Sequence, residues 1–179
     1  MKPDFTSQVI LIACGDYRLA SFVRKYLKRI YFYTEMDILT TAGGSKTISC
    51  SIWDDFSIVN IIHIFIEYCK ILCKIWSLWI DFGAYYHHGA KVCVIANHNF
   101  CGFWKKFVNA EEEKAAHINS LIKAGNIIKE KYPGIEKIIL LYVILNKDTH
   151  KAILVIEIDG ISGERKETDI KKGGKGWYN

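Results

Sequence analysis

Two cysteines and a histidine in this chain follow short apolar segments that have the pattern of buried strands. Cys14 comes directly after residues 9–13, and His98 and Cys101 come after residues 92–96. Thiolate and imidazole groups are ligands that Zn²⁺ takes in tetrahedral protein sites. Because all three side chains stand where strands should end, the sequence predicts a zinc site made by Cys14, His98 and Cys101.

Three protein ligands would leave one zinc coordination position open. An open position is typical of catalytic zinc, because it admits a water molecule whose pKa the metal lowers to about 7. Asp16 follows Cys14 by two residues, so its carboxylate can accept a hydrogen bond from that water or bind the metal as a fourth ligand. A bidentate pair with Arg18 would hold Asp16 ionised and turned toward the water, whereas a broken pair would free it to close the site. The sequence leaves both arrangements open.

The elements that must position these residues follow from hydrophobic periodicity. Helices are predicted over residues 19–30 and 110–131. Strands are predicted over five apolar segments, 8–14, 37–41, 92–96, 138–145 and 152–158. The link of residues 146–151 is too short for a crossover helix, so the last two strands should form an antiparallel hairpin. The expected fold is α/β: a mostly parallel sheet of about five strands with one antiparallel edge strand and helices on both faces.

Length and composition predict a single zinc-binding domain over residues 1–160 and a basic, flexible tail over 161–179. The chain has 179 residues, of which half are hydrophobic, and a net charge of +5. The basic residues gather at 24–29 and in the tail, where we interpret them as a solvated helix face and a solvated terminus and expect no nucleic-acid partner. The first residues have no signal-peptide pattern, so we expect a cytoplasmic protein whose six cysteines are reduced thiols.

The segment 53–81 has a narrow polar stripe on an otherwise apolar helical pattern. Charges near its middle are costly in hydrocarbon, so we expect no membrane span. The pattern fits a subunit interface or an ordinary core helix. Two histidines elsewhere, His117 on the second predicted helix and His150 in the hairpin turn, are predicted to lie at the surface.

Three motifs in order, Cys14-x-Asp16-x-Arg18, Ala42-Gly43-Gly44 and His98-x-x-Cys101-Gly102, resemble those of the beta-class carbonic anhydrases. The resemblance extends from Val9 to about Ile158. It implies reversible hydration of CO₂ to bicarbonate by attack of zinc-bound hydroxide, with Asp16 orienting the nucleophile and Arg18 fixing Asp16.

The same resemblance implies a substrate pocket beside the zinc, to which we assign Gly43, Gly44, Phe100 and Gly102. It also implies a homodimer or higher homo-oligomer. The pair Gly43-Gly44 is followed by Ser45-Lys46-Thr47, but this stretch lacks the glycine spacing of a nucleotide-binding loop.

Some positions depart from the motifs of the class: Tyr17 stands between Asp16 and Arg18, and Asn99-Phe100 stands between His98 and Cys101. Two alternatives to CO₂ hydration therefore stay open. One is a zinc hydrolase of a CO₂ analogue such as carbonyl sulfide or carbon disulfide. The other is a non-catalytic zinc protein in which Asp16 closes the site.

Overall fold

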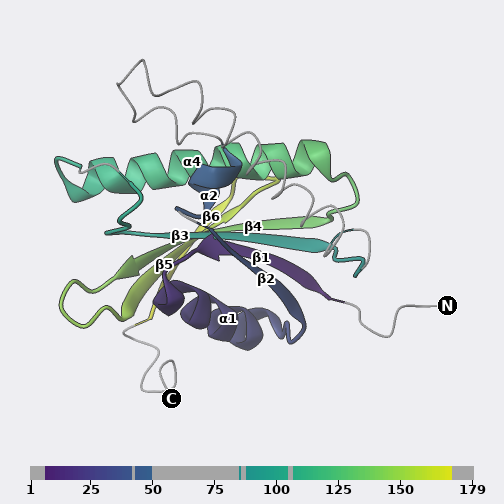
Figure 1. Ribbon diagram of the computed structural model, residues 1–179, viewed down its shortest axis with the longest axis horizontal. Helices are drawn as coiled ribbons and strands as arrows, with labels where there is room; N and C mark the ends of the chain where they lie inside the picture. The colour runs from purple at the N-terminus through teal and green to yellow at the C-terminus, as the bar shows by residue number, and fades with distance from the viewer. Residues whose placement is uncertain (1–6, 42, 50–84, 86–87, 105–106, 171–179) are drawn as a thin grey trace, which may run out of the picture.

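The computed structural model describes residues 7–41, 43–49, 85, 88–104 and 107–170, which form a mixed α/β fold around a six-stranded sheet (Figure 1). The strands are β1 (Val9–Cys14), β2 (Met36–Thr41), β3 (Val92–His98), β4 (Lys137–Leu145), β5 (Ala152–Asp159) and β6 (Arg165–Asp169). Their order across the sheet is β2-β1-β3-β4-β5-β6. The first four run parallel to one another, and β5 and β6 pair antiparallel. The predicted mostly parallel sheet and the final hairpin are therefore confirmed.

The strand count corrects one part of the prediction. Residues 165–169, which the sequence analysis placed in the tail, form β6, so the sheet has six strands and β5 is not its edge. The sequence Arg-Lys-Glu-Thr-Asp has no apolar alternation that would indicate a strand. It pairs because the outer side of β5 offers unpaired backbone groups. Residues 171–179 of the predicted tail lie outside the described residues.

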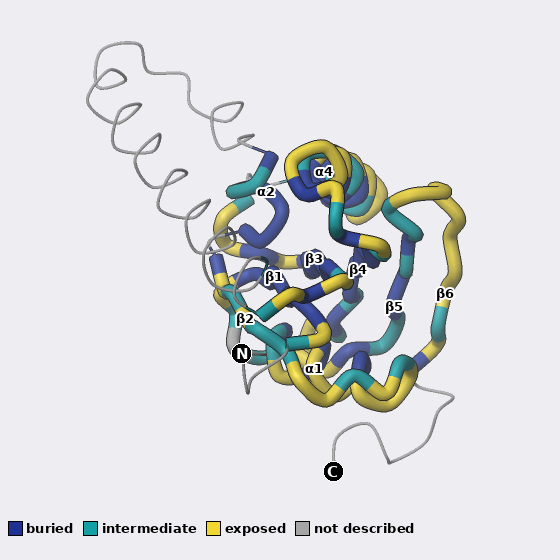
Figure 2. Tube along the Cα trace, turned by 90° about the vertical axis from the view of Figure 1, so that its right-hand side faces the viewer, coloured by how far each residue is buried: buried dark blue, intermediate teal, exposed yellow. Residues whose placement is uncertain are grey.

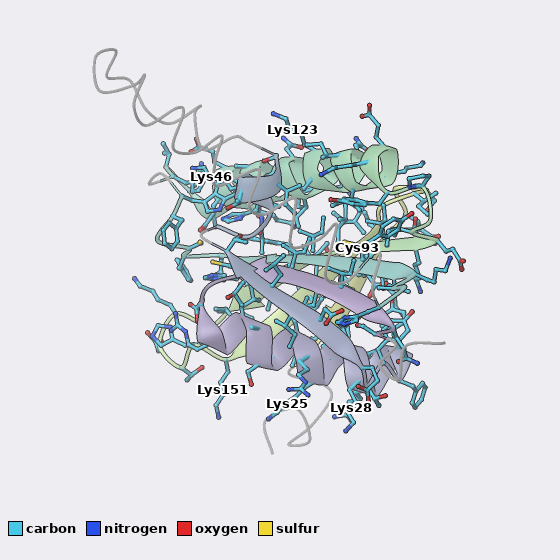
Figure 3. The ribbon with its side chains drawn as sticks, turned by 45° about the vertical axis from the view of Figure 1, so that its right-hand side comes forward. Lys25, Lys28, Lys46, Cys93, Lys123 and Lys151 are labelled. Carbon is cyan, nitrogen blue, oxygen red and sulfur yellow. The ribbon has the colours of Figure 1, made fainter. Side chains whose placement is uncertain are left out.

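Helices cover both faces of the sheet, as predicted. The helix α1 (Tyr17–Tyr31) lies on one face, and α4 (Ala110–Lys131) lies on the other together with the short α2 (Ser45–Ile48) (Figure 1). On α1, Lys25 and Lys28 lie on the side that faces away from the sheet and are exposed (Figure 3). This confirms that the first basic cluster is a solvated helix face.

The core lies on both sides of the central strands. Residues of β1 alternate between the two faces: Val9, Leu11 and Ala13 pack on the α1 side, and Ile10 and Ile12 pack on the α4 side. Burial on both faces is typical of parallel strands covered by helices. Figure 2 shows this burial at the centre of the sheet, whereas β6 at its edge is largely exposed.

The segment 53–81, for which a subunit interface or a core helix was predicted, lies outside the described residues. Within the parts of the chain that the structure does describe, no helix is both long and apolar enough to cross a membrane. Among the cysteines, Cys93 is buried in the core as expected of a structural thiol, and it is visible within the sheet in Figure 3.

Candidate metal centre

The topology brings the ends of β1 and β3 together. These strands are parallel neighbours, with Ala13 opposite Ala96, so Cys14 and His98 end them at the same edge of the sheet. The chain leaves β1 through α1 on one face toward β2, and it leaves β3 through α4 on the other face toward β4. A point where consecutive connections diverge in this way leaves a crevice at the carboxyl ends of the strands, where α/β proteins bind ligands. The fold therefore places the predicted zinc ligands at its natural binding position.

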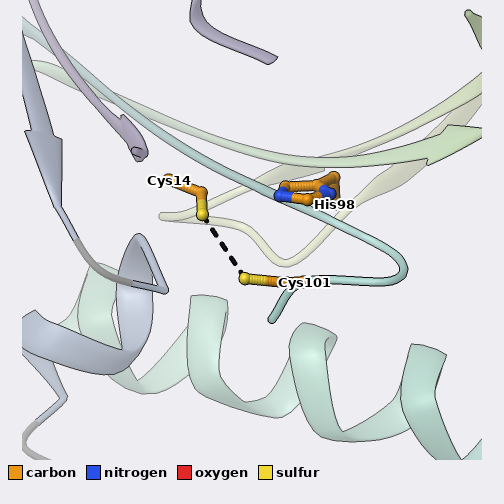
Figure 4. Close-up of side chains that lie close together, drawn as sticks. All are labelled: Cys14, His98 and Cys101. Carbon is orange, nitrogen blue, oxygen red and sulfur yellow. Dashed lines mark hydrogen bonds between the residues drawn. The ribbon is translucent and has the colours of Figure 1, made fainter. Parts of the chain in front are cut away.

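The three predicted ligands converge. The Sγ atoms of Cys14 and Cys101 lie 3.4 Å apart. Figure 4 marks this hydrogen bond with a dashed line and shows the His98 ring beside it. One ligand atom from each of the three residues lies within 4.8 Å of the others, and all three residues are buried. Zinc–sulfur bonds of about 2.3 Å in a tetrahedron separate two sulfurs by roughly 3.8 Å, so the spacing suits a metal ion after a small adjustment. The group could hold such an ion.

The hydrogen bonds of His98 leave one ring nitrogen free for a metal. Its Nδ1 lies 2.7 Å from the carbonyl oxygen of Asn99, and a carbonyl only accepts, so Nδ1 carries the proton and donates. The lone pair is then on Nε2, which is buried and has no hydrogen-bond partner in the described structure. Metal-binding histidines are oriented in this way, with the non-ligating nitrogen donating to a carbonyl. A metal ion would satisfy an atom that is otherwise costly to bury.

The pKa values of the two thiols are shifted in opposite directions. A hydrogen bond from Cys101, together with contacts to His98 and the backbone at Asp16, outweighs burial and lowers the pKa of Cys14 to about 4. The same contact with the Cys14 sulfur, together with burial, raises the pKa of Cys101. Burial alone would lower the pKa of His98, but contacts with Cys14, the Asn99 carbonyl and Asp16 raise it overall. This excess of negative charge around a buried imidazole suits a cation.

Asp16 and Arg18 form the bidentate pair that the sequence analysis weighed against a broken one. Arg18 donates from Nε to both carboxylate oxygens, at 2.8 and 3.2 Å, and from Nη2 to Oδ2 at 2.5 Å. The Arg18 side chain lowers the pKa of Asp16 below its ordinary value. Asp16 Oδ2 is 3.9 Å from His98 Nε2, so the carboxylate stands beside the ligand atoms while it is held by Arg18. Of the two arrangements that the sequence left open, the structure has the one in which Asp16 is paired with Arg18.

A pocket of about 350 Å³ opens at this edge of the sheet. Its lining consists of the three candidate metal ligands, the Asp16–Arg18 pair and three neighbouring residues, Gly15, Gly102 and Phe103. Of the four residues assigned to the substrate pocket from the sequence, Gly102 is in this lining, and Gly43, Gly44 and Phe100 are not. Phe103, which the sequence analysis did not select, contributes the aromatic wall.

Gly43 and Gly44 do not line the pocket, but they allow close packing against residues that do. Both have positive φ, and a Cβ on Gly44 would lie 2.4 Å from Asn97 Oδ1 and 3.1 Å from the backbone nitrogen of Cys14. A Cβ on Gly43 would lie 3.5 Å from the Cβ of Phe103. The glycine turn therefore supports the end of β1 and the segment after Cys101.

The structure adds residues that the sequence analysis missed or misplaced. His117, predicted at the surface, is completely buried, whereas His150 is exposed as expected. The sequence contained a signal for the burial of His117, because Glu113, His117, Leu121, Ala124 and Ile128 recur at helical spacing on one face of α4. Asn99 also has a role, since its side chain accepts from the Leu145 N–H at 2.7 Å and donates to the Leu145 carbonyl at 3.1 Å.

The sequence is similar to proteins of two Rickettsia species. No protein-family model matches the chain. A protein of Rickettsia bellii described as uncharacterized is 26% identical over 136 residues, which are 73% of each chain. A second uncharacterized protein, from Rickettsia conorii, is 27% identical over 139 residues, which are 73% of this chain and 64% of that protein.

Among solved structures, the chain is similar to the beta-carbonic anhydrase isoform I of the protozoan Trichomonas vaginalis. The superposition covers 92% of this chain and 88% of the other, with a TM-score of 0.46 and 16% sequence identity. The two folds are only loosely alike at this score, so the candidate site is judged by its own residues.

Proposed function

We propose that this protein is a zinc enzyme that interconverts CO₂ and bicarbonate. One observation carries the proposal: three buried ligand atoms, from Cys14, His98 and Cys101, converge at a pocket that the Asp16–Arg18 pair also lines. A structural zinc site needs four protein ligands and no pocket. Here three ligands meet a pocket with an ionised, positioned carboxylate.

Cys14, His98 and Cys101 would hold the metal, with His98 binding through Nε2. When bound, zinc supplies a Lewis acid that makes water nucleophilic near neutral pH. Asp16 would accept a hydrogen bond from that water and so turn one of its lone pairs toward the substrate. Arg18 keeps Asp16 ionised and fixes its orientation, because its guanidinium binds both carboxylate oxygens.

The pocket suits a small substrate with little polarity. Phe103 and Gly102 contribute apolar lining, and Arg18 is the one long polar side chain among the described residues that line the pocket. CO₂ fits this chemistry, and the product bicarbonate would be attracted by Arg18. Carbonyl sulfide and carbon disulfide have the same linear, apolar shape, so hydrolysis of one of them is the alternative reaction of the same site.

The test is stopped-flow hydration of CO₂ by protein whose zinc content is near one per chain. We expect rates well above buffer for the wild-type protein, measured at neutral and mildly alkaline pH. Activity only at alkaline pH would indicate that Asp16 closes the site at neutral pH. Background rates with CO₂ but turnover of carbonyl sulfide would favour the alternative substrate, and background rates with both would contradict the enzymatic proposal.

We also propose that the protein is a homodimer. Three exposed apolar side chains, Phe100, Phe103 and Val108, lie in one short segment of the chain that includes Cys101, and a surface of this kind is typical of an interface. Light scattering coupled to size-exclusion chromatography should give twice the mass of 20.6 kDa. A monomer at micromolar concentration would contradict this part of the proposal.

A further inference from the structure

The loop that joins His98 to Cys101, called the metal loop below, has an unusual conformation at one residue. Phe100 has a φ of 55°, in the left-handed region that residues with a bulky side chain rarely adopt. Such a conformation is strained and persists only where the surroundings hold it. The position of Cys101 relative to His98 depends on this residue, because Phe100 is the residue directly before Cys101.

The beginning of the loop is fixed by the sheet. His98 still pairs with Val143 in the β3–β4 ladder, and Asn99 binds the backbone of Leu145 through both ends of its side-chain amide. On the other side of the loop, the Cys101 carbonyl accepts a hydrogen bond from the Trp104 N–H at 3.1 Å, which closes a turn. The remaining freedom of the loop is therefore concentrated at Phe100.

A carboxylate from α4 holds this position. Glu113 Oε1 accepts the backbone N–H of Phe100 at 2.6 Å, and the residue is only 9% exposed. The other recorded partner of Glu113 in the described structure is His117, whose Nε2 is 3.9 Å away. His117 is neutral at ordinary pH, because burial lowers its pKa to about 3, so it does not hold Glu113 by charge. The nearly buried carboxylate is directed at the metal loop.

We propose that Glu113 is a positioning residue for the metal centre: by binding the Phe100 N–H it fixes the left-handed turn and so places Cys101 beside Cys14 and His98. The inference rests on the proposed function in that it takes these three residues as metal ligands. It adds a residue from α4, fifteen positions after His98 in the chain, to the apparatus of the site. Partners of this kind around metal ligands typically change metal affinity 10-fold to 100-fold.

The test compares Glu113 with its neighbour Glu112, which is a matched control. Glu112 lies in the same turn of α4 and also accepts a backbone N–H, from Val108 at 2.8 Å, but Val108 is 91% exposed and lies outside the metal loop. Dissociation constants of Zn²⁺ and Co²⁺ are measured by competition with a chromophoric chelator for the full-length protein and its variants. The thiolate-to-cobalt absorption band reports the geometry of the two sulfurs directly, and helix stability by itself would not move it.

We expect Glu113→Ala to weaken zinc binding about 10-fold to 100-fold and to shift the cobalt band. Glu113→Gln should retain wild-type affinity within about 3-fold, because its amide oxygen still accepts the N–H. Glu112→Ala should leave both the affinity and the band unchanged. If Glu113→Ala does not fold, Glu113→Asp keeps the charge but is too short to reach Phe100, and we expect it to shift the band and weaken binding.

The outcomes separate this inference from the proposed function. Wild-type affinity and an unchanged cobalt band in Glu113→Ala or Glu113→Asp would overturn the role of Glu113 while leaving the metal centre intact. Wild-type protein that binds neither Zn²⁺ nor Co²⁺ would overturn the metal centre itself, and with it the inference. Equal losses in the Glu112 and Glu113 variants would also overturn the inference, because they would indicate a general effect on α4.

Discussion

The side chains of two adjacent residues of β3, Asn97 and His98, lie on opposite faces of the sheet. The polar atoms of Asn97 have hydrogen-bond partners, whereas one ring nitrogen of His98 has none in the described structure. On the α2–α4 side, Asn97 accepts from the Ser45 N–H at 3.0 Å and donates to Ser45 Oγ at 2.6 Å. Ser45 Oγ in turn contacts Ser120 Oγ at 2.9 Å. On the α1 side, His98 has a buried Nε2 that no described residue satisfies. Asn97 therefore has hydrogen-bond partners within the protein, whereas His98 keeps one nitrogen free for a ligand.

The comparison also shows that an unsatisfied nitrogen alone is a poor sign of a metal site. Both ring nitrogens of His117 are buried without a hydrogen-bond partner in the described structure. Aromatic rings pack against it: the centroid of the Trp104 ring is 4.0 Å and that of the Tyr142 ring 5.3 Å from its own ring centroid, and among the described residues a single carboxylate, that of Glu113, lies 3.9 Å from its Nε2. What distinguishes His98 is the presence of two sulfurs that converge with its free nitrogen. Convergence of donors is therefore the feature to test.

The largest effect is expected for removal of one of these sulfurs. Cys101→Ala leaves two ligands, so the protein should lose bound zinc and all CO₂ hydration above buffer. The matched control is Cys93→Ala, which removes a buried thiol in the core and should retain zinc. Zinc content by atomic absorption and stopped-flow rates check both variants. Full activity of Cys101→Ala without zinc would contradict the proposed mechanism.

A smaller effect is expected when the ligands stay but the carboxylate is neutralised. Asp16→Asn should retain zinc and lower kcat about 100-fold, because an amide no longer orients the nucleophilic water and loses the ion pair with Arg18. Asp37→Asn is a suitable control, since Asp37 pairs with His88 at 2.7 Å on the surface away from the pocket. Unchanged kcat in Asp16→Asn would show that the pair has only a structural role.

On the opposite face of β3 we expect a loss of stability without a loss of metal. Ser45→Ala removes the hydroxyl that Asn97 and Ser120 contact, so buried polar groups lose a partner and the free energy of unfolding should fall by about 1–3 kcal/mol. Urea unfolding measures this change, with the exposed Ser21→Ala as control. The contrast between the faces fails if Ser45→Ala weakens zinc binding as much as it weakens the fold.

At neutral pH the smallest effect is expected for the buried histidine that has no metal partners, because its contribution changes only in acid. Burial, with the charges of His98 and Lys46, lowers the pKa of His117 from 6.5 to about 3. Between these pH values the unfolded chain binds a proton that the folded chain does not. The free energy of unfolding should therefore keep its full value above about pH 6.5 and fall by up to about 1.4 kcal/mol per pH unit toward pH 3.

His117→Phe keeps an aromatic ring and should remove this part of the acid sensitivity. The difference in unfolding free energy between wild type and variant, measured from pH 7 to pH 4, isolates the contribution of His117. A constant difference across that range would show that His117 does not stay neutral in the folded protein.

The sequence allowed much of the fold to be predicted because the central elements are strongly patterned. Apolar strands buried on both faces and the amphipathic helix α1 have unambiguous periodicities, and α4 has the predicted bounds, 110–131. The edge strand β6 could not be found in this way. All five of its residues are polar, and it is a strand only because β5 lies beside it.

The candidate site was predictable to the extent that it depends on strand ends. Cys14 and His98 end neighbouring strands, so their convergence follows from topology, and Asp16 and Arg18 follow from the first turn of α1. The contributions of Glu113 and Phe103 depend on how α4 and the metal loop pack in three dimensions. No local spacing in the sequence encodes those contacts.

The most direct test of the central claim is zinc K-edge X-ray absorption of the full-length protein loaded with one equivalent of zinc. We predict a first shell of two sulfurs at about 2.3 Å and two lighter atoms at about 2.0–2.1 Å, one of them an imidazole nitrogen. The sulfur count should fall to one in any zinc that Cys101→Ala retains. A wild-type shell without sulfur, or no retained zinc, would contradict a metal centre at the ends of β1 and β3.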